Sequence, residues 1–408
     1  MVRRGTVGAV IGCLLALALA CSGCGLASSP SPVAAGGPPS TLAPKPTPAP
    51  SRSPRPRLSC PARVFAGMTA AQRVGQLFLV GIAGDPGTVV ARAVAAYHFG
   101  SLLFGTTSAA GVEEDRQLAL ASQALASARA TARVRFFIAA DQEGGEVQRL
   151  RGPGFAAISS ALAQGQLSPG ALQQLAAAWG HELSSAGVNL DLAPVMDVVP
   201  PGTADLNQPI GVLQREFGDN PQTVAAHGAA FIRGLRQAGV AATAKHFPGL
   251  GRERGNTDFT SGVVDTTTTP DDPYLGSFQA AIDAGVPFVM IALASYLRID
   301  PTHLAAFSPR VMRTMLRQQM RFHGVIVSDD LGAAEAVAGM TSAARAIGFV
   351  AAGGDMITSV SLSAAAEMDT AILGRVGHDP AFRSEVNSAV TRILAAKQAY
   401  GLLPCPAR

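Results

Sequence analysis

The strongest constraint on the fold is one pattern that repeats from about residue 65 onward. Each repeat has a short apolar run rich in β-branched or aromatic residues, then a polar or glycine-rich loop, then a longer alanine-rich stretch typical of a helix. Apolar runs with little alternation indicate strands covered on both faces, as in parallel sheets. The runs are 76–83, 100–105, 135–141, 188–197, 240–247, 287–295, 324–330 and 354–360.

The alternation of strands with helices predicts an α/β fold. A chain of 408 residues that is 48% hydrophobic could form one large barrel or two ordinary domains. Eight strands over about 340 residues fit a single (β/α)8 TIM barrel, which we predict. A doubly wound open sheet is the alternative, but no glycine-rich dinucleotide or P-loop motif follows the first run. Helices are expected at 115–132, 169–186, 221–238, 273–284, 308–321 and 341–351.

The N-terminal segment has the pattern of an export signal. Two arginines precede an apolar run that is shorter than a typical membrane-spanning helix. The following "ALACSGCG" resembles the lipobox of bacterial lipoproteins, in which a signal peptidase cuts before a cysteine that then receives lipid. Cys24 is preferred to Cys21 as this cysteine, which makes 1–24 a lipoprotein signal peptide. We expect an exported protein, lipid-anchored at the outer face of the cell membrane, with plain secretion as the alternative.

Residues 25–60 are rich in Pro, Ser, Ala and Gly and lack apolar periodicity, so they cannot bury enough surface to fold. They are expected to form a tether before a catalytic domain at 61–408. Cys60 and Cys405 lie at the two ends of this domain. Export to an oxidising compartment favours a disulfide between them, and two free thiols are the alternative.

Composition and motifs exclude several function classes. The net charge of +4 is small for this length, and no basic stripe interleaved with aromatic residues indicates nucleic-acid binding. The seven histidines are scattered and form no metal-binding motif, so no metal or other cofactor is expected. A Gly-x-Ser-x-Gly nucleophile motif is also absent from the sequence. We expect a monomer whose partner is a carbohydrate and whose only link to a membrane is the lipid anchor.

Charged residues gather where the predicted strands end. In a TIM barrel these ends open onto one face, which carries the chemistry. Each of these charged residues, taken alone, could have a purely structural role. Acids at strand ends often cap the next helix, and Glu143 could pair with Arg149 or lie in solvent. Together they suit a polyhydroxylated ligand whose hydroxyls are gripped by acids and bases while one carboxylate attacks carbon. The set is Asp141, Glu143, Arg149, Asp197, Arg215, Lys245, His246, Asp329 and Asp330.

Four segments in order resemble the signatures of one enzyme family. They are "AADQEGGEVQRL", "QREFGDNP", "KHFPGLG" and "GVIVSDDLGAA". They look like those of the bacterial β-N-acetylglucosaminidases of glycoside hydrolase family 3, of the actinobacterial and mycobacterial lipoprotein type. The resemblance covers about residues 65 to 400. It implies a TIM barrel and a retaining enzyme that needs no metal.

The resemblance also assigns roles to residues. Asp329, the first aspartate of "SDD", matches the nucleophile, which its basic neighbours should keep ionised. A second group matches residues that hold the hydroxyl and acetamido groups of the sugar. This group comprises Asp141, Arg149, Arg215, Lys245 and His246.

The sequence departs from the family pattern at the general acid/base. The family uses an Asp-x-His pair in the loop after "KHFPG", whereas this chain has Asp258 followed by Phe259 and Thr260. Threonine cannot protonate a leaving group near neutral pH. Asp258, or Glu253 in the same loop, could therefore serve directly. The other interpretations are slow turnover of poor leaving groups, or phosphate in place of water.

The resemblance therefore implies an exo-acting retaining β-N-acetylglucosaminidase that removes terminal β-linked N-acetylhexosamine, and peptidoglycan fragments are the expected substrate. Three alternatives remain. One is a sugar- or muropeptide-binding lipoprotein with impaired catalysis, and another is a phosphorolytic form of the same enzyme. The third is an aldolase-like barrel in which Lys245 forms a Schiff base.

Overall fold

Parallel strands form a closed barrel in the computed structural model, which describes residues 37, 58–82 and 87–405. Within these residues the barrel has eight strands in the order β1-β13-β12-β9-β7-β6-β3-β2. Each lies inside one of the predicted apolar runs, and the predicted (β/α)8 barrel is confirmed. The strands are β1 Phe78–Ile82, β2 Ser101–Phe104, β3 Phe137–Ala140, β6 Leu190–Asp191, β7 Ala241–Phe247, β9 Phe288–Ile291, β12 Val325–Asp330 and β13 Met356–Ser359. The predicted signal peptide, with Cys21 and Cys24, lies outside the described residues.

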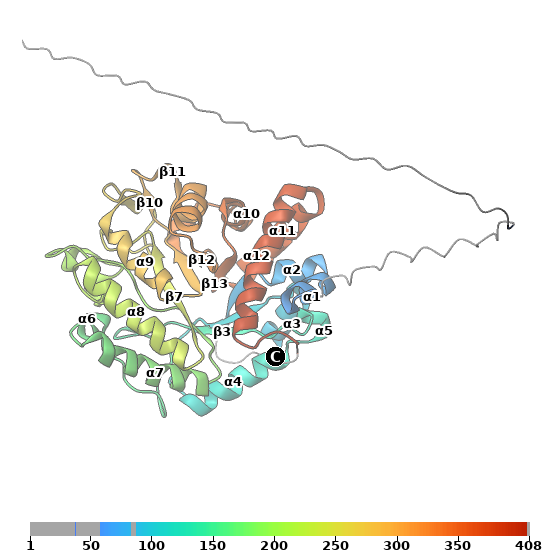
Figure 1. Ribbon diagram of the computed structural model, residues 1–408, viewed down its shortest axis with the longest axis horizontal. Coiled ribbons are helices and arrows are strands. Elements are labelled where there is room, and N and C mark those ends of the chain that lie inside the picture. The colour runs from blue at the N-terminus through green and yellow to red at the C-terminus, as the bar shows by residue number, and fades with distance from the viewer. Residues whose placement is uncertain (1–36, 38–57, 83–86, 406–408) are drawn as a thin grey trace, which may run out of the picture. The chain divides into compact units, whose positions relative to one another are not determined.

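Helices surround the barrel strands (Figure 1). Their starts follow from local chemistry: α7, α8 and α12 each begin with a proline that follows a capping Ser, Asn or Asp. Each cap accepts a hydrogen bond from a free backbone N–H of the first turn, worth about 1 kcal/mol. The helices are α1 Cys60–Gly67, α2 Ala70–Gly75, α3 Thr88–Tyr97, α4 Val112–Ala124, α5 Ala128–Thr131, α6 Ala161–Gln164, α7 Pro169–Ser185, α8 Pro221–Gln237, α9 Gly276–Asp283, α10 Ser342–Ala352, α11 Leu362–His378 and α12 Pro380–Ala399. The predicted helix at 308–321 is a π-helix, Arg310–Gln319.

Two small sheets stand outside the barrel. A hairpin joins β4 (Gln142–Gly144) to β5 (Val147–Gln148) directly after β3. The other sheet has the order β11-β10-β8, with bounds Asp300–Leu304, Ser295–Tyr296 and Val264–Asp265. Both are additions to the loops at the carboxyl ends of barrel strands, where they shape the mouth of the barrel.

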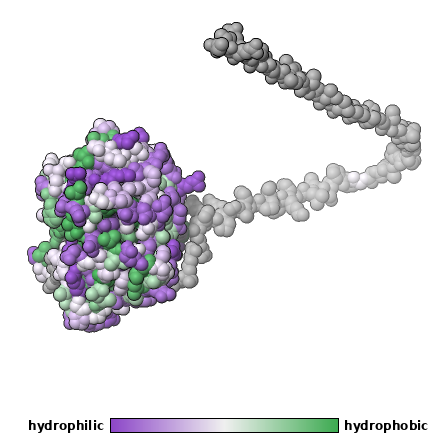
Figure 2. Space-filling view, turned by 90° about the vertical axis from the view of Figure 1, so that its left-hand side faces the viewer, coloured by the Kyte–Doolittle hydropathy of each residue, from purple (hydrophilic) through white to green (hydrophobic). Residues whose placement is uncertain are grey.

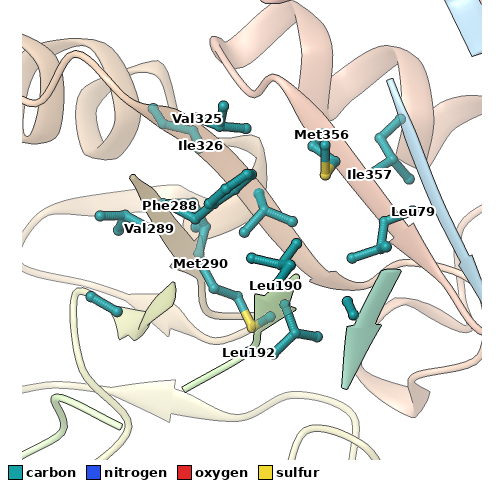
Figure 3. Packing of buried hydrophobic residues seen from close by; sticks show 14 of the residues in the cluster. Leu79, Leu190, Leu192, Phe288, Val289, Met290, Val325, Ile326, Met356 and Ile357 are labelled. Atoms are coloured by element: carbon teal, nitrogen blue, oxygen red, sulfur yellow. The ribbon is translucent and has the colours of Figure 1, made fainter. Parts of the chain in front are cut away.

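Apolar side chains fill the barrel interior. Figure 3 shows residues from β1, β6, β9, β12 and β13 packed against one another, among them Leu79, Leu190 and Met356. The rings of Phe137 and Phe288 meet edge to face with centroids 5.3 Å apart. The interior is therefore a solid core that holds the strand ends in fixed positions. The outer surface in Figure 2 is a mixture of hydrophilic and scattered hydrophobic residues.

A buried lysine ties the last helix to the amino-terminal end of the barrel. Lys397 of α12 donates to the side-chain oxygen of Gln76 at 2.8 Å and to the carbonyl of Gly100 at 2.6 Å. These partners lie just before β1 and β2, opposite the strand ends that carry the site. Burial lowers the pKa of Lys397 to about 7. In the described part of the chain, no helix is long and apolar enough to cross a membrane.

A disulfide joins Cys60 to Cys405, so the ends of the domain are linked across 345 positions of the sequence. Cys60 is the first residue of α1, which is capped by Ser59, and this helix starts one residue before the predicted domain boundary. The bond closes nearly the whole domain into one loop. In the chain-entropy description, a longer closed loop restricts the unfolded state more strongly.

The double variant Cys60→Ser/Cys405→Ser should lower the free energy of unfolding by about 2–5 kcal/mol, because the unfolded chain is no longer constrained. Denaturant unfolding under oxidising conditions measures the change. The reduced parent protein serves as the control and should unfold like the variant. Equal unfolding midpoints for the oxidised parent and the variant would show that the bond contributes nothing.

Candidate active site

A cavity of about 480 Å³ lies at the carboxyl ends of the barrel strands. Buried apolar residues of the barrel, including Leu103, Leu192 and Met290, form part of its lining. The lining also contains acidic and basic side chains from several strand ends and loops. The lining brings together the residues that match the nucleophile and the sugar-binding group of the family, together with Asp258. They are Asp141, Arg149, Arg215, Lys245, His246, Asp258 and Asp329.

Strand β7 supplies both Lys245 and His246. Adjacent residues of a regular strand point to opposite faces, yet both of these reach the cavity. The register of β7 against β9 shifts between Ala244 and Phe247, and such an irregularity redirects side chains. The peptide bond between Lys245 and His246 is cis. Both residues lie near the carboxyl end of β7 and within the predicted run 240–247.

Lys245 is buried between two carboxylates. Its ammonium nitrogen lies 2.6 Å from an oxygen of Asp141 and 2.6 Å from an oxygen of Glu143, and its side chain is only 2% exposed. Burial alone would lower the pKa of Lys245, but the charges of Asp141 and Glu143 outweigh it and raise the pKa. Lys245 is therefore held as a cation that fixes the two acids.

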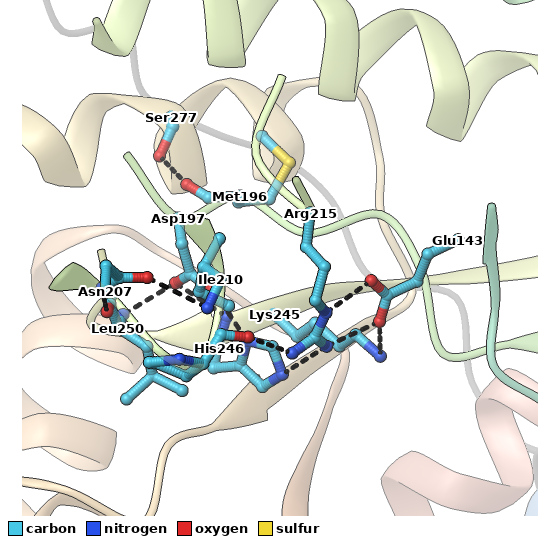
Figure 4. A network of polar contacts seen from close by, with 12 residues as sticks. Glu143, Met196, Asp197, Asn207, Ile210, Arg215, Lys245, His246, Leu250 and Ser277 are labelled. Atoms are coloured by element: carbon cyan, nitrogen blue, oxygen red, sulfur yellow. Dashed lines mark hydrogen bonds and ion pairs between the residues drawn. The ribbon is translucent and has the colours of Figure 1, made fainter. Parts of the chain in front are cut away.

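Glu143 pairs with Arg215 as well as with Lys245, which corrects the expectation that it pairs with Arg149 or lies in solvent. The Arg215 guanidinium donates twice, from Nε at 2.8 Å and from Nη2 at 2.7 Å, as Figure 4 shows. Burial alone would raise the pKa of Glu143, but Arg215 and Lys245 bring it to about 2. Glu143 is therefore a buried anion that orients two cations of the cavity.

Arg149 is left without an acidic partner. Among the residues that the structure describes, no carboxylate forms an ion pair with its guanidinium. Its backbone N–H donates to the carbonyl of Asp141 at 3.0 Å, which fixes the start of the side chain at the cavity. A half-buried arginine held in this way can donate several hydrogen bonds to a ligand.

Asp197 orients His246 rather than capping a helix. One Asp197 oxygen lies 2.8 Å from Nδ1 of His246, and the other accepts from the backbone N–H groups of His246 and Leu250. A carboxylate only accepts, so Nδ1 carries the proton. Nε2 is 3.5 Å from Nη2 of Arg215, a donor, and faces the cavity as an acceptor.

Asn207 connects the two loops that carry Arg215 and Asp258. Its amide nitrogen donates to the carbonyls of Leu250 and Glu253, at 2.8 and 2.7 Å. Its oxygen accepts from the N–H groups of Ile210 and Gly211, at 3.0 and 2.7 Å. The buried side-chain amide of Asn207 thus has all its donors and its acceptor satisfied, and these bonds fix one loop against the other (Figure 4).

Asp258 and Asp329 face the same cavity. The loop around Asp258 is fixed to the loop after β12, because Glu335 N–H donates to its carbonyl at 3.1 Å and Ala336 N–H donates to the carbonyl of Thr257 at 3.0 Å. Partial burial of its carboxylate raises the pKa of Asp258, and the neighbouring charge of Asp329 raises it further. Asp258 is therefore the carboxyl group of this pair whose surroundings favour binding of a proton.

The two aspartates of "SDD" have different surroundings. Asp330 accepts from the backbone N–H groups of Gly332, Ala333 and Val360, which occupy both of its oxygens. Asp329 accepts only from the N–H of Asp330, at 2.8 Å, among the hydrogen bonds of the described chain. No ion pair links Asp329 to a cation there, so the basic neighbours expected around it are not in direct contact. Asp329 is half-buried and available to a ligand.

Glu253 and Thr260 lie on a second cavity, of about 390 Å³, and not on the first. Glu253 is buried, and its pKa rises to about 8 through burial and the nearby Asp265. Its oxygen Oε1 has no hydrogen-bond partner within the described residues. Of the two acids proposed from the sequence as acid/base, only Asp258 therefore lines the cavity with Asp329.

The arrangement suits acid-base and nucleophilic chemistry on a hydroxyl-rich molecule. Two carboxyl groups face one space, one of them with a raised pKa, as a proton donor and a nucleophile require. Paired cations and anions beside them offer donors and acceptors at fixed positions. In the described parts of the chain, no group of three or more His, Cys, Asp or Glu residues has the geometry to hold a metal ion.

Comparisons with known proteins agree with this chemistry. The sequence pattern of the "Glycosyl hydrolase family 3 N terminal domain" matches residues 69–396. A beta-hexosaminidase from Xanthomonas oryzae is 36% identical over 263 residues, which are 61% of this chain and 75% of that protein.

Solved structures are also similar. The beta-N-acetylhexosaminidase from Beutenbergia cavernae is 47% identical, with a TM-score of 0.80 over 81% of this chain and 99% of the other. M. tuberculosis LpqI is 26% identical, with a TM-score of 0.71 over 82% of this chain and 96% of the other.

The variant Glu143→Gln should lower the free energy of unfolding by about 3–5 kcal/mol, because it leaves buried Arg215 and Lys245 without their shared anion. Chemical denaturation near pH 7 measures this loss. The control is Glu113→Gln, which removes an exposed pair with Arg116 and should change stability by less than about 1 kcal/mol.

The Glu143 contribution should also depend on pH. Its pKa is about 2 in the folded protein, below its ordinary value of 4.5, so its stabilisation is complete above pH 4.5 and is lost as the pH falls toward 2. The stability difference between the parent and Glu143→Gln should shrink over that range. A difference that stays constant from pH 7 to the acid limit would contradict the ion-pair account.

Proposed function

Because the chain belongs to glycosyl hydrolase family 3, we propose that it is an exo-acting enzyme that removes terminal β-linked N-acetylhexosamine and retains the anomeric configuration. One observation carries this proposal: Asp329, whose carboxylate accepts only the backbone N–H of Asp330 within the described chain, shares a cavity with Asp258, whose pKa is raised. A sugar between them meets a nucleophile and a proton donor.

In the first step, Asp329 attacks the anomeric carbon and forms an ester to the sugar. The bond from that carbon to the glycosidic oxygen breaks, and Asp258 gives its proton to the departing oxygen. In the second step, Asp258, now a carboxylate, takes a proton from water. The resulting hydroxide attacks the anomeric carbon, and the ester electrons return to Asp329. Two inversions leave the configuration unchanged.

The charged network holds the sugar during both steps. Asp141 accepts from sugar hydroxyls, and Lys245 prevents it from moving. Arg149 and Arg215 donate to hydroxyl and acetamido oxygens, and Nε2 of His246 accepts. The side chains of Asp141, Arg215 and His246 are fixed by protein partners before the substrate arrives, so little reorganisation is needed on binding.

Asp258 serves directly as the acid/base in this proposal. Its placement in the cavity and its raised pKa support this role, whereas Thr260 and Glu253 line the other cavity. The aldolase-like alternative is disfavoured, because Lys245 is held between two carboxylates that raise its pKa. A Schiff-base lysine must be neutral to attack a carbonyl.

We also propose that the enzyme acts outside the cell on N-acetylglucosamine-containing fragments of peptidoglycan, anchored by a lipid on Cys24. The export pattern and the lipobox-like "ALACSGCG" support this location. Mass spectrometry of the mature N-terminus distinguishes a lipid on Cys24 from one on Cys21 and from an unmodified end.

The variant Asp329→Ala should lose at least about 10⁴-fold in kcat on nitrophenyl β-N-acetylglucosaminide, because no group remains to form the ester. Added azide should restore turnover by entering the vacated space, and the product should be the α-glycosyl azide. Asp330→Asn is the matched variant at the neighbouring position and should keep measurable unassisted activity. Full activity of Asp329→Ala without azide would exclude the proposed mechanism. Assays of the parent with and without phosphate separate hydrolysis from phosphorolysis.

The variant Asp258→Ala should lose about 10²- to 10⁴-fold in kcat/KM on a sugar leaving group and much less on nitrophenolate, which leaves without a proton. The comparison uses the β-linked disaccharide of N-acetylglucosamine and its nitrophenyl glycoside. Glu253→Gln is the control and should affect both substrates equally. Equal losses on the two substrates for Asp258→Ala would contradict a role in leaving-group protonation.

A further inference from the structure

Phe259 is the most exposed large hydrophobic side chain in the described part of the protein. It is 80% accessible to solvent, whereas the next most exposed, Val89, is 63% accessible and lies on helix α3. Phe259 lines the cavity that contains Asp258 and Asp329. Its ring therefore lies at the mouth of the active site and has no role in the core.

The backbone at Phe259 is held in place although the ring is exposed. Its N–H donates to the carbonyl of Asn256 at 3.0 Å, which closes a tight turn. The preceding residues, Thr257 and Asp258, accept from the backbone of the loop after β12, the strand that carries Asp329. The backbone position from which the ring extends is therefore set relative to both carboxyl groups of the proposed mechanism.

The residues proposed to bind the sugar are less exposed than some apolar residues of the cavity lining. The charged side chains that are proposed to grip one sugar are buried or half-buried. Two further apolar residues of the lining are more accessible: Leu213 is half-buried and Val360 is exposed. A ligand that extends out of the charged part thus meets apolar surface. An exposed aromatic ring binds an apolar face of a ligand favourably, because water leaves both the ring and that face.

We propose that Phe259 forms a leaving-group subsite, in which its ring stacks on the apolar C–H face of the second pyranose ring. This inference rests on the proposed glycosidase function. In that reaction the bond that breaks lies between the gripped sugar and the next group, and Asp258 protonates the oxygen between them. Phe259 directly follows Asp258 in the chain, so a ring that contacts Phe259 has its linking oxygen close to the acid.

The physical consequence is selectivity for leaving groups that present a flat apolar face. Such a contact adds binding energy only for the part of the substrate that departs. The affinity for a single sugar in the charged part of the cavity should not depend on Phe259. A loss that affects the disaccharide but not the single sugar therefore distinguishes a subsite contact from a general effect on the loop.

The test compares the parent with Phe259→Ala, Phe259→Tyr and the control Leu120→Ala, which removes another exposed apolar side chain on α4, outside the cavity. Two quantities are measured: kcat/KM for the β-linked disaccharide of N-acetylglucosamine, and the inhibition constant of N-acetylglucosamine itself. Phe259→Ala should lower kcat/KM by about 5- to 10-fold and leave the inhibition constant within about 2-fold. Phe259→Tyr and Leu120→Ala should stay close to the parent.

Several outcomes overturn the inference. If Phe259→Ala cleaves the disaccharide as well as the parent does, Phe259 contributes no subsite. If both quantities worsen equally, or if Phe259→Tyr fails as badly as Phe259→Ala, the ring acts through the loop and not by stacking. A parent that turns over neither the disaccharide nor the nitrophenyl glycoside contradicts the proposed function itself, and the inference fails with it.

Discussion

Lys245 is buried between the carboxylates of Asp141 and Glu143, and neither the cation nor the acids would be stable there alone. Unpaired charges in such a position cost several kcal/mol, so each charge of the network is stabilised by its partners. Arg215 extends it through Glu143 toward His246, which Asp197 orients in turn. The strand ends of the barrel bring these residues together, and the solid apolar interior keeps the strand ends fixed. Because the charges are paired with one another, their donors and acceptors keep fixed positions at which a sugar can bind.

The loop after β7 divides its side chains between two cavities. Asp258 and Phe259 face the charged cavity, whereas Glu253 and Thr260 face the other one. Backbone hydrogen bonds from Glu335 and Ala336 fix the part of the loop that carries Asp258, so Asp258 is held against the loop that follows Asp329. In the proposed mechanism, Asp258 takes the place of the histidine that the family pattern has near this position. A carboxyl group whose pKa is raised by burial and by a neighbouring acid can hold the proton that histidine would otherwise carry.

Sequence patterns were enough to predict the barrel, because strands buried on both faces must be continuous apolar runs. They also located the charged residues that line the cavity, since strand ends of a barrel share one face. The pairing of Glu143 could not be predicted, because the hairpin of β4 and β5 turns it back toward Arg215, 72 positions away. The only signal in the sequence was its position, two residues after Asp141 at the end of the apolar run 135–141. The roles of Asn207 and Asp197 likewise depend on contacts between distant loops, and the separation of Glu253 from the cavity depends on the path of one loop.

The central claim is that Asp329 forms a covalent bond to the sugar. An activated N-acetylglucosaminyl donor with a ring fluorine that slows breakdown of the ester allows the intermediate to be trapped and digested for mass spectrometry. We expect one added sugar on the peptide that contains β12, assigned by fragmentation to Asp329. A sugar attached to Asp258 or Asp330, or no adduct on an enzyme that consumes the donor, would contradict it.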